Sequence, residues 1–219
     1  MKKILEHGHC ILVDSMGNDL SISRAARVSY DAEGRPEDKK LIEYLWANKH
    51  ATPFEAVTFT FDIKAPVFVF RQWHRHRTQS YNELSARYRK LPAEMYVPAL
   101  DQITTQSTDN KQMRTLEQNP HAAVISEIIR QQNASSYHAY EELLALDCPR
   151  ELARGVLPFN IFSHMQTTIN LRNLFAFCTL RDHDHAQHEI RVYAKEMIDL
   201  IRPIVPIAVA AWEASHHGN

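Results

Sequence analysis

An alternating segment at residues 57–64 most constrains the fold of this chain. Its odd positions are apolar and its even positions are polar or charged. Successive side chains of an extended strand point to opposite faces, so such alternation predicts a strand with one buried and one open face. The apolar set is Val57, Phe59, Phe61 and Ile63, and the polar set is Thr58, Thr60, Asp62 and Lys64.

Helical patterns flank this strand in the sequence. Residues 37–48 place apolar side chains on one side of a helix, and a long helix is predicted around residues 125–143. Residues 67–75 are ambiguous, because Pro66 suits the first turn of a helix while the Val-Phe-Val-Phe run that follows also fits a strand. The predicted class is α+β, and helix dominates it.

Two further helices are predicted from their starting residues. Pro149 suits the first position of a short helix running through Gly155. Asp184 is the predicted N-cap of a last long helix that ends near Ile201, with Gln187 at the capping-box partner position.

Length and composition are those of one domain over residues 1–219. A chain of 219 residues with 44% hydrophobic content can bury a sizeable core, and its 5 glycines form no linker. Residues 101–118 are rich in Gln, Thr and Asn and offer little to bury. We expect this stretch to be a surface excursion.

The sequence carries no pattern of export or membrane insertion. Charged and histidine side chains at residues 6–9 interrupt the apolar run near the N-terminus, and no apolar run is long enough to span a bilayer. The three cysteines are widely separated and form no Cys-x-x-Cys pair, which indicates reduced thiols. We expect a cytoplasmic protein.

Positive charge is concentrated at residues 71–90. Six Lys or Arg residues stand there against one acid, Glu83, which leaves a local charge of +5 in a chain of net charge −1. Arginine presents a planar fork of donors that matches phosphate oxygens. The segment therefore predicts an anionic ligand.

Residues 75–87 read Arg-His-Arg-x-x-Ser-x-Asn-Glu-x-Ser-x-Arg. This pattern resembles the signature of the flavin-dependent thymidylate synthases at every fixed position. Further similar blocks follow in the family's order, and the resemblance covers most of residues 10–200. They are residues 16–19, 24–29, 50–55, 149–158, 170–172 and 180–190.

The resemblance implies a reaction, a cofactor and an assembly. The reaction is transfer of the methylene of 5,10-methylenetetrahydrofolate to C5 of deoxyuridine monophosphate (dUMP), without a covalent enzyme nucleophile. FAD, reduced by NADPH, supplies the hydride, and the products are thymidylate (dTMP) and tetrahydrofolate. The implied protein is a single domain of helices and antiparallel sheet that forms a homotetramer with shared active sites.

The resemblance also assigns residues. Arg181 matches the catalytic residue that stabilises negative charge on the pyrimidine. The implied dUMP contacts are Gln72, Trp73, His74, Arg75, Glu83, Leu84, Ser85, Ala86, Arg87, Arg154 and Arg181. The implied FAD contacts are Thr52, Arg75, His76, Arg77, Glu83, Asn170, Leu171 and Arg172, with His50 as a candidate folate or flavin contact. Ala176 departs from the family, which carries Asn there, and no metal is expected.

Two other functions compete with this interpretation. Residues 182–189 hold three His and three carboxylates, and His185 and His188, one helical turn apart, could bind the ion of a metallohydrolase. Alternatively, residues 71–90 could bind nucleic acid, with three aromatic side chains as stacking platforms. The near-zero net charge disfavours that second function. The three aromatic residues are Trp73, Tyr81 and Tyr88.

Two side chains, Cys148 and Ser85, are candidate nucleophiles. Cys148 precedes a predicted helix start, where the helix dipole lowers a thiol pKa, yet the position is also explained as a helix entry. Ser85 has no base beside it in sequence, so we interpret it as a nucleotide-positioning hydroxyl.

Overall fold

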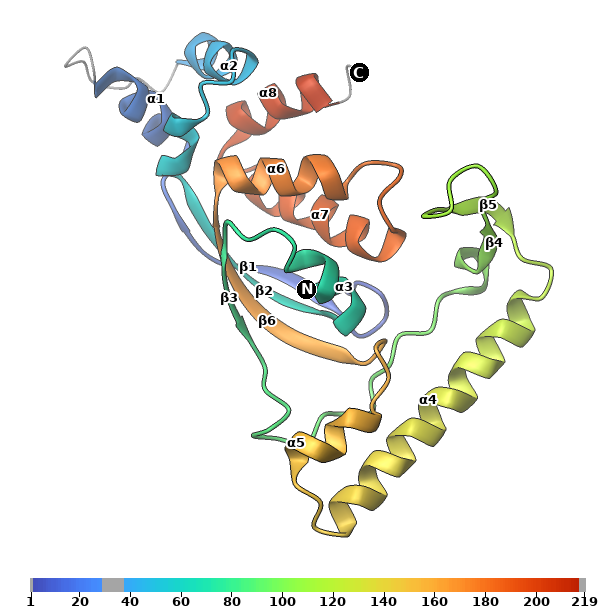
Figure 1. Ribbon diagram of the computed structural model, residues 1–219. Helices are drawn as coiled ribbons and strands as arrows, with labels where there is room; N and C mark the ends of the chain where they lie inside the picture. Colours follow the sequence, from blue (N-terminus) through green and yellow to red (C-terminus); the bar gives the residue numbers. More distant parts are fainter. Residues whose placement is uncertain (1, 29–37, 217–219) are drawn as a thin grey trace.

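Four antiparallel strands form the central sheet of the computed structural model, which describes residues 2–28 and 38–216 (Figure 1). The strand order is β1-β2-β6-β3, so strands distant in sequence lie side by side. The strands are β1 (His9–Met16), β2 (Thr58–Pro66), β6 (Phe162–Asn170) and β3 (Ser80–Glu83).

The predicted alternation at residues 57–64 is confirmed in β2. Phe59, Phe61 and Ile63 are fully buried, whereas Asp62 and Lys64 on the other face keep partial exposure. Burying three large apolar side chains contributes roughly 1.5–3 kcal/mol each. One face of the sheet therefore anchors the core, and the other carries polar side chains.

Three helices cover the apolar face: α3 (Val67–Trp73), α6 (Leu171–Arg181) and α7 (His188–Ile201) (Figure 1). The ambiguous residues 67–75 form a helix because Val69, Phe70 and Trp73 make one buried helical face. Pro66 is the residue before the first helical position, one place earlier than predicted.

A second group of helices packs at one end of the sheet. It comprises α1 (Asp19–Arg27), α2 (Lys39–Ala47), the 3₁₀ turn η2 (Thr52–Ala56) and α8 (Pro206–His216). The helix predicted at residues 37–48 is α2, and Glu37 lies outside the described residues. The Trp46 indole donates to Ser215 Oγ at 2.8 Å, which joins α2 to α8.

An arm extends from the other end of the sheet (Figure 1). Its main element is α4 (Ala122–Ala145), which confirms the long predicted helix and is about 36 Å long at 1.5 Å per residue. The short α5 (Arg150–Ala153) and the turn η4 (Arg154–Val156) follow it. They agree with the short helix predicted through Gly155, although Pro149 again precedes the first helical residue.

Residues 101–118 form regular structure. After the turn η3 (Leu100–Gln102), strands β4 (Thr104–Gln106) and β5 (Arg114–Gln118) pair as an antiparallel hairpin. Arg114 Nη2 lies 3.1 Å from Glu189 Oε1, which ties the hairpin to α7. An ion pair with a buried carboxylate thus holds a segment that has little apolar surface.

The predicted start of the last long helix is wrong. Helix α7 begins at His188, its N-cap is Gln187, and no side chain caps it. Asp184 instead pairs with Arg191, 3.2 Å from Oδ1 to Nη1. The end near Ile201 is confirmed. Among the described residues, no helix combines the length and apolar character needed to cross a membrane.

Candidate active site

Arg181, the last residue of α6, is bonded directly to His76 in the loop after α3. Its Nε donates to His76 Nε2 at 2.9 Å, and its Nη2 donates to the Gln72 carbonyl at 3.4 Å. Burial, reinforced by the positive charge of Arg181, lowers the pKa of His76 to about 4. The imidazole is therefore neutral near pH 7 and accepts the bond from Arg181.

The loop that carries His76 is fixed by buried groups beneath it. The Tyr81 hydroxyl donates to the carbonyl of His76, Gln79 Oε1 accepts from Thr167 at 2.8 Å, and the Phe177 ring lies 4.8 Å from the imidazole. The carbonyl oxygen of Trp73 also accepts from Tyr81. These contacts hold the imidazole in one orientation.

Trp73 is one of the expected dUMP contacts. Its side chain is fully buried, with its ring centroid 4.7 Å from that of Phe177, so the side chain supports α3 and only the backbone can meet a ligand. By contrast, Arg75 and Arg77 are exposed, and neither has an ion-pair partner in the part of the chain that the structure describes. Two unpaired guanidinium groups beside a neutral imidazole can receive a large anionic ligand.

A second group of expected dUMP residues lies at the start of β6. Glu83 Oε1 accepts from the Ser163 hydroxyl at 2.8 Å, and His74 Nε2 is 3.9 Å from the other carboxylate oxygen. A cavity of about 260 Å³ opens beside them. It is lined in part by Glu83, Leu84, Ala86, Arg154, Leu157 and Ser163.

Two arginines border this second group from different elements. Arg87 Nε lies 3.4 Å from Glu151 on α5, and Arg154 Nε donates to the Glu151 carbonyl at 3.3 Å. Ser85 Oγ accepts from the Arg87 backbone N–H at 3.3 Å. Arg87 and Arg154 both stay exposed, so their remaining donors are open to a phosphate.

A third group gathers expected FAD residues where β6 meets α6. The Asn170 side chain caps α6 by accepting from Asn173 N at 2.9 Å, and Arg172 pairs with Glu55. Thr52, the first residue of η2, and His50, two residues before it, are both exposed. The side chain of Leu171, another expected FAD contact, is fully buried, so only its backbone can meet a ligand.

The second and third groups are too far apart to meet in one chain. Ser163, the partner of Glu83, and Asn170 lie seven residues apart on β6. At about 3.3 Å per residue, they are separated by roughly 23 Å. The expected dUMP residues also divide between the Arg181 group and the Glu83 group. Within one chain the expected site residues therefore form separate groups.

The metal alternative does not assemble at residues 182–189. Asp182 pairs with Lys195, Asp184 with Arg191, and Glu189 with Arg114. Within the described ranges, the donor atoms that converge belong to His9, Asp62 and His164, at a different place in the fold.

The aromatic platform for nucleic acid is also incomplete. Trp73 is buried, and the Tyr81 hydroxyl is bonded to backbone carbonyls, whereas Tyr88 is 82% exposed. Cys148 lies two residues before α5, where its Sγ is 3.8 Å from the Pro149 carbonyl oxygen.

A family model described as "Thymidylate synthase complementing protein" matches residues 11–207. A flavin-dependent thymidylate synthase of Treponema denticola is 47% identical over 217 residues, which cover 96% of this chain and 81% of that protein. The chain belongs to the flavin-dependent thymidylate synthase family. The resemblance of residues 75–87 is thereby confirmed. A second member, from Thermotoga neapolitana, is 45% identical over 93% of this chain and 89% of its own length.

A solved structure confirms the fold. The UMP/dUMP methylase PolB of Streptomyces cacaoi, bound with 5-Br dUMP, superimposes with a TM-score of 0.87 at 31% identity. The match covers 94% of this chain and 95% of that one. The α+β class with antiparallel sheet is therefore the fold of this synthase.

Several supporting residues were missed by the sequence interpretation. Gln79 and Tyr81 stand at variable positions of the signature, and Ser163 and Thr167 belong to no quoted block. The sequence does not indicate these supporting roles, because they depend on contacts formed only in the folded chain, such as those of Tyr81 with the Trp73 and His76 carbonyls. Ser29, in the family-like block at residues 24–29, lies outside the described residues, and Ala176 is exposed on α6.

Proposed function

We propose that this chain methylates dUMP to dTMP. The methylene of 5,10-methylenetetrahydrofolate is transferred to C5, a hydride reduces it to methyl, the C5 proton leaves, and tetrahydrofolate is released. FAD, charged by NADPH, supplies the hydride when bound. No enzyme nucleophile takes part.

The Arg181–His76 bond is the observation that carries this proposal. The family resemblance assigns Arg181 to the pyrimidine and His76 to the flavin, and the reaction requires those two ligands to touch. The two side chains lie 2.9 Å apart although 105 residues separate them in sequence. Ligands bound to each would therefore be adjacent.

Arg181 can stabilise charge on the pyrimidine while it stays bonded to the protein. A guanidinium has five N–H donors. One is used by His76 and one by the Gln72 carbonyl, so three remain for a ligand. C5 of the ring becomes nucleophilic when negative charge develops at N3 and O4, and a preorganised cation stabilises that charge without changing its own protonation.

The exposed cations fit a flavin dinucleotide. Arg75 and Arg77 are unpaired among the described residues, and Arg172 is half-exposed beside Glu55. These groups are suited to bind the FAD pyrophosphate, and neutral His76 is suited to contact the ring system. His50, exposed near Thr52, is the proposed folate or flavin contact.

We place each active site between copies of the chain in a homotetramer. One copy provides Gln72 and Arg181, and a second provides Glu83, Ser85, Ala86, Arg87 and Arg154 around its cavity. The arm supports this assembly, because it exposes large apolar side chains that a lone chain leaves uncovered. They include Val124, Ile128, Leu146, Leu152 and Phe159.

The proposed location is the cytoplasm. Cys10, Cys148 and Cys178 are all free thiols, as a reducing compartment favours. The reactants are small molecules, and neither nucleic acid nor membrane has a proposed role.

The first test is the visible absorbance of the purified protein under anaerobic conditions. A flavin spectrum that bleaches with NADPH should recover on addition of methylenetetrahydrofolate when dUMP is present, and not without dUMP. A colourless protein that takes up no added FAD would refute the proposal.

The shared site is tested by mixing two inactive variants. Arg181→Ala and Arg87→Ala alter different copies of the same proposed site. Mixed tetramers should regain activity, because some sites then combine an intact Arg181 with an intact Arg87. Mixing Arg181→Ala with Gln72→Ala is the matched control, because one copy provides both residues to each proposed site. This mixture should regain no activity. Equal recovery in both mixtures would contradict the division of residues.

A further inference from the structure

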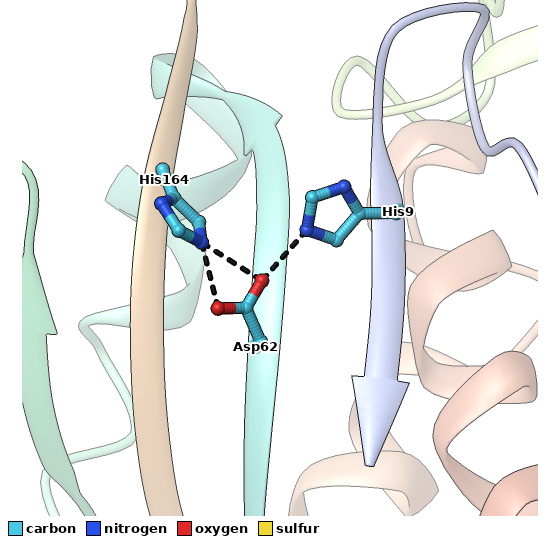
Figure 2. Close-up of side chains that lie close together, drawn as sticks. All are labelled: His9, Asp62 and His164. Carbon is cyan, nitrogen blue, oxygen red and sulfur yellow. Dashed lines mark hydrogen bonds and ion pairs between the residues drawn. The ribbon is translucent and has the colours of Figure 1, made fainter. Parts of the chain in front are cut away.

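Three strands bring His9, Asp62 and His164 together on the open face of the sheet (Figure 2). His9 Nε2 lies 2.7 Å from Asp62 Oδ1, and His164 Nε2 lies 2.8 Å from both carboxylate oxygens. One ligand atom from each residue lies within 4.8 Å of the others. This cluster is separate from the Arg181 group and has no part in the proposed reaction.

The sheet fixes the positions of the three side chains. Asp62 is on β2, between β1 and β6, and both histidines lie opposite Lys64 in the strand register, one on each side. The two imidazoles therefore approach the carboxylate from opposite flanks, as Figure 2 shows. Strands paired in register hold such a group with little freedom, which suits a metal site.

We propose that His9, Asp62 and His164 bind a divalent transition-metal ion, with Zn²⁺ the best match. Two imidazole nitrogens and one carboxylate oxygen are donors that zinc accepts. With metal–ligand distances of about 2.0–2.2 Å, donors around a tetrahedral ion lie roughly 3.3 Å apart. The two His–Asp separations of 2.7 and 2.8 Å need to open by about half an ångström, and the donor atoms of all three residues already lie within 4.8 Å of one another.

The cluster also has room for a fourth ligand. A cavity of about 130 Å³ adjoins it, lined in part by His9, Glu94 and His164, and it can hold water. The His164 side chain is 44% exposed, which gives an ion a route from solvent.

Two cations border this cavity and oppose binding. Lys64 is neutralised by Glu94, 2.6 Å from Nζ to Oε2, whereas Arg89, which also lines the cavity, keeps its charge. The carboxylate of Asp62 bears the negative charge that favours the ion. We therefore expect a zinc affinity lower than that of a three-ligand site without a nearby positive charge. Zinc should be preferred over Mg²⁺, because Mg²⁺ requires oxygen ligands.

A bound ion would fasten three strands of the sheet. It would join β1 to β2 and β6 near the start of β6, where Ser163 lines both this cavity and the one beside Glu83. The inferred role is structural support for the β6 end that carries the nucleotide cavity.

The experiment uses full-length protein freed of metal with a chelator and then dialysed against Zn²⁺ or Mg²⁺. Metal analysis should find one zinc per chain and no magnesium. X-ray absorption at the zinc edge should show nitrogen and oxygen neighbours with imidazole scattering. The proposal fails if native protein retains no stoichiometric zinc, or if sulfur is among the neighbours.

Variants assign the ion to its residues. Asp62→Asn and His164→Gln should each weaken zinc binding by more than the 10- to 100-fold that loss of a supporting hydrogen bond costs. His138→Gln, an exposed histidine on α4, is the matched control and should bind zinc as native protein does. Zinc that survives in Asp62→Asn and His164→Gln but is lost in His185→Gln would overturn the assignment. His164→Gln alters a partly exposed side chain, so the test does not depend on the folding of Asp62→Asn.

Discussion

Replacing Arg181 by Lys isolates what the guanidinium contributes beyond its charge. Arg181 holds His76 with one donor at 2.9 Å and the Gln72 carbonyl with another at 3.4 Å, which leaves three for the pyrimidine. An ammonium keeps the positive charge but is a point donor on a flexible stem. It cannot hold His76 and reach N3 and O4 together.

The expected loss follows from these contacts. Removing one preorganised donor from a developing anion typically lowers kcat by about 10²–10³, or about 2.7–4 kcal/mol. The lost bond to His76 should lower the free energy of unfolding by about 1–2 kcal/mol, because a part-buried hydrogen bond from a charged donor is removed. FAD affinity should stay close to native, because the proposed contacts of Arg181 are with the nucleotide.

The assay is anaerobic dTMP formation at saturating dUMP, folate, NADPH and FAD, together with FAD binding followed by flavin fluorescence. Arg202→Lys is the matched control, because Arg202 makes two bonds to Glu213 at 2.8 and 2.9 Å away from the site. A kcat for Arg181→Lys within threefold of native would refute the reasoning. Loss of FAD together with turnover would assign Arg181 a structural role instead.

Three further predictions concern single side chains. Ser85→Ala should weaken dUMP binding roughly 2- to 10-fold, the cost of one hydroxyl hydrogen bond, and should keep measurable turnover. Calorimetry measures the binding. Complete loss of turnover with normal dUMP binding would instead indicate that Ser85 is a nucleophile. Trp73→Ala should lower the free energy of unfolding by about 3–5 kcal/mol in urea, because the side chain is fully buried, and a cost below 1 kcal/mol would contradict its place in the core. His76 has a pKa of about 4 in the folded protein against 6.5 when unfolded, so the unfolded chain binds the proton first and stability should fall as pH drops from about 6.5 to 4. After allowance for its partial exposure, we expect a loss on the order of 1–2 kcal/mol, and His76→Gln should flatten this part of the stability profile; an unchanged profile would rule out His76 as the source.

Local patterns predicted the elements whose stability comes from a repeating apolar face. The alternation at residues 57–64 gave β2, and the apolar spacing around residues 125–143 gave α4. Patterns of single residues were less reliable. Asp184 is of a residue type that commonly caps helices, yet it pairs with Arg191. A turn precedes His188, so α7 begins later than predicted. The polar residues 101–118 form a hairpin, because Glu189 provides a buried partner for Arg114 that no local pattern contains.

In the active site, too, the sequence identified the residues but not which of their neighbours are buried. Every fixed residue of residues 75–87 could be read from the chain, and with them the family and its reaction. Yet Trp73, only two residues before the signature, belongs to the core, while Arg75 is exposed. The boundary between core and site falls inside one helix and the loop after it, and only packing against Phe177 decides which side chain turns inward.

The sequence by itself determined the half-buried central strand, helices α2 and α4, the cationic segment and the family. Only the tertiary structure decided which distant side chains meet: Arg181 with His76, 105 residues apart, and Asp62 with His9 and His164, 53 and 102 residues away. The physical reason is that helical and strand periodicity arise from neighbours along the chain, whereas these contacts depend on strand order and register. Those are set by the burial of the whole apolar face at once, and no local segment contains that information.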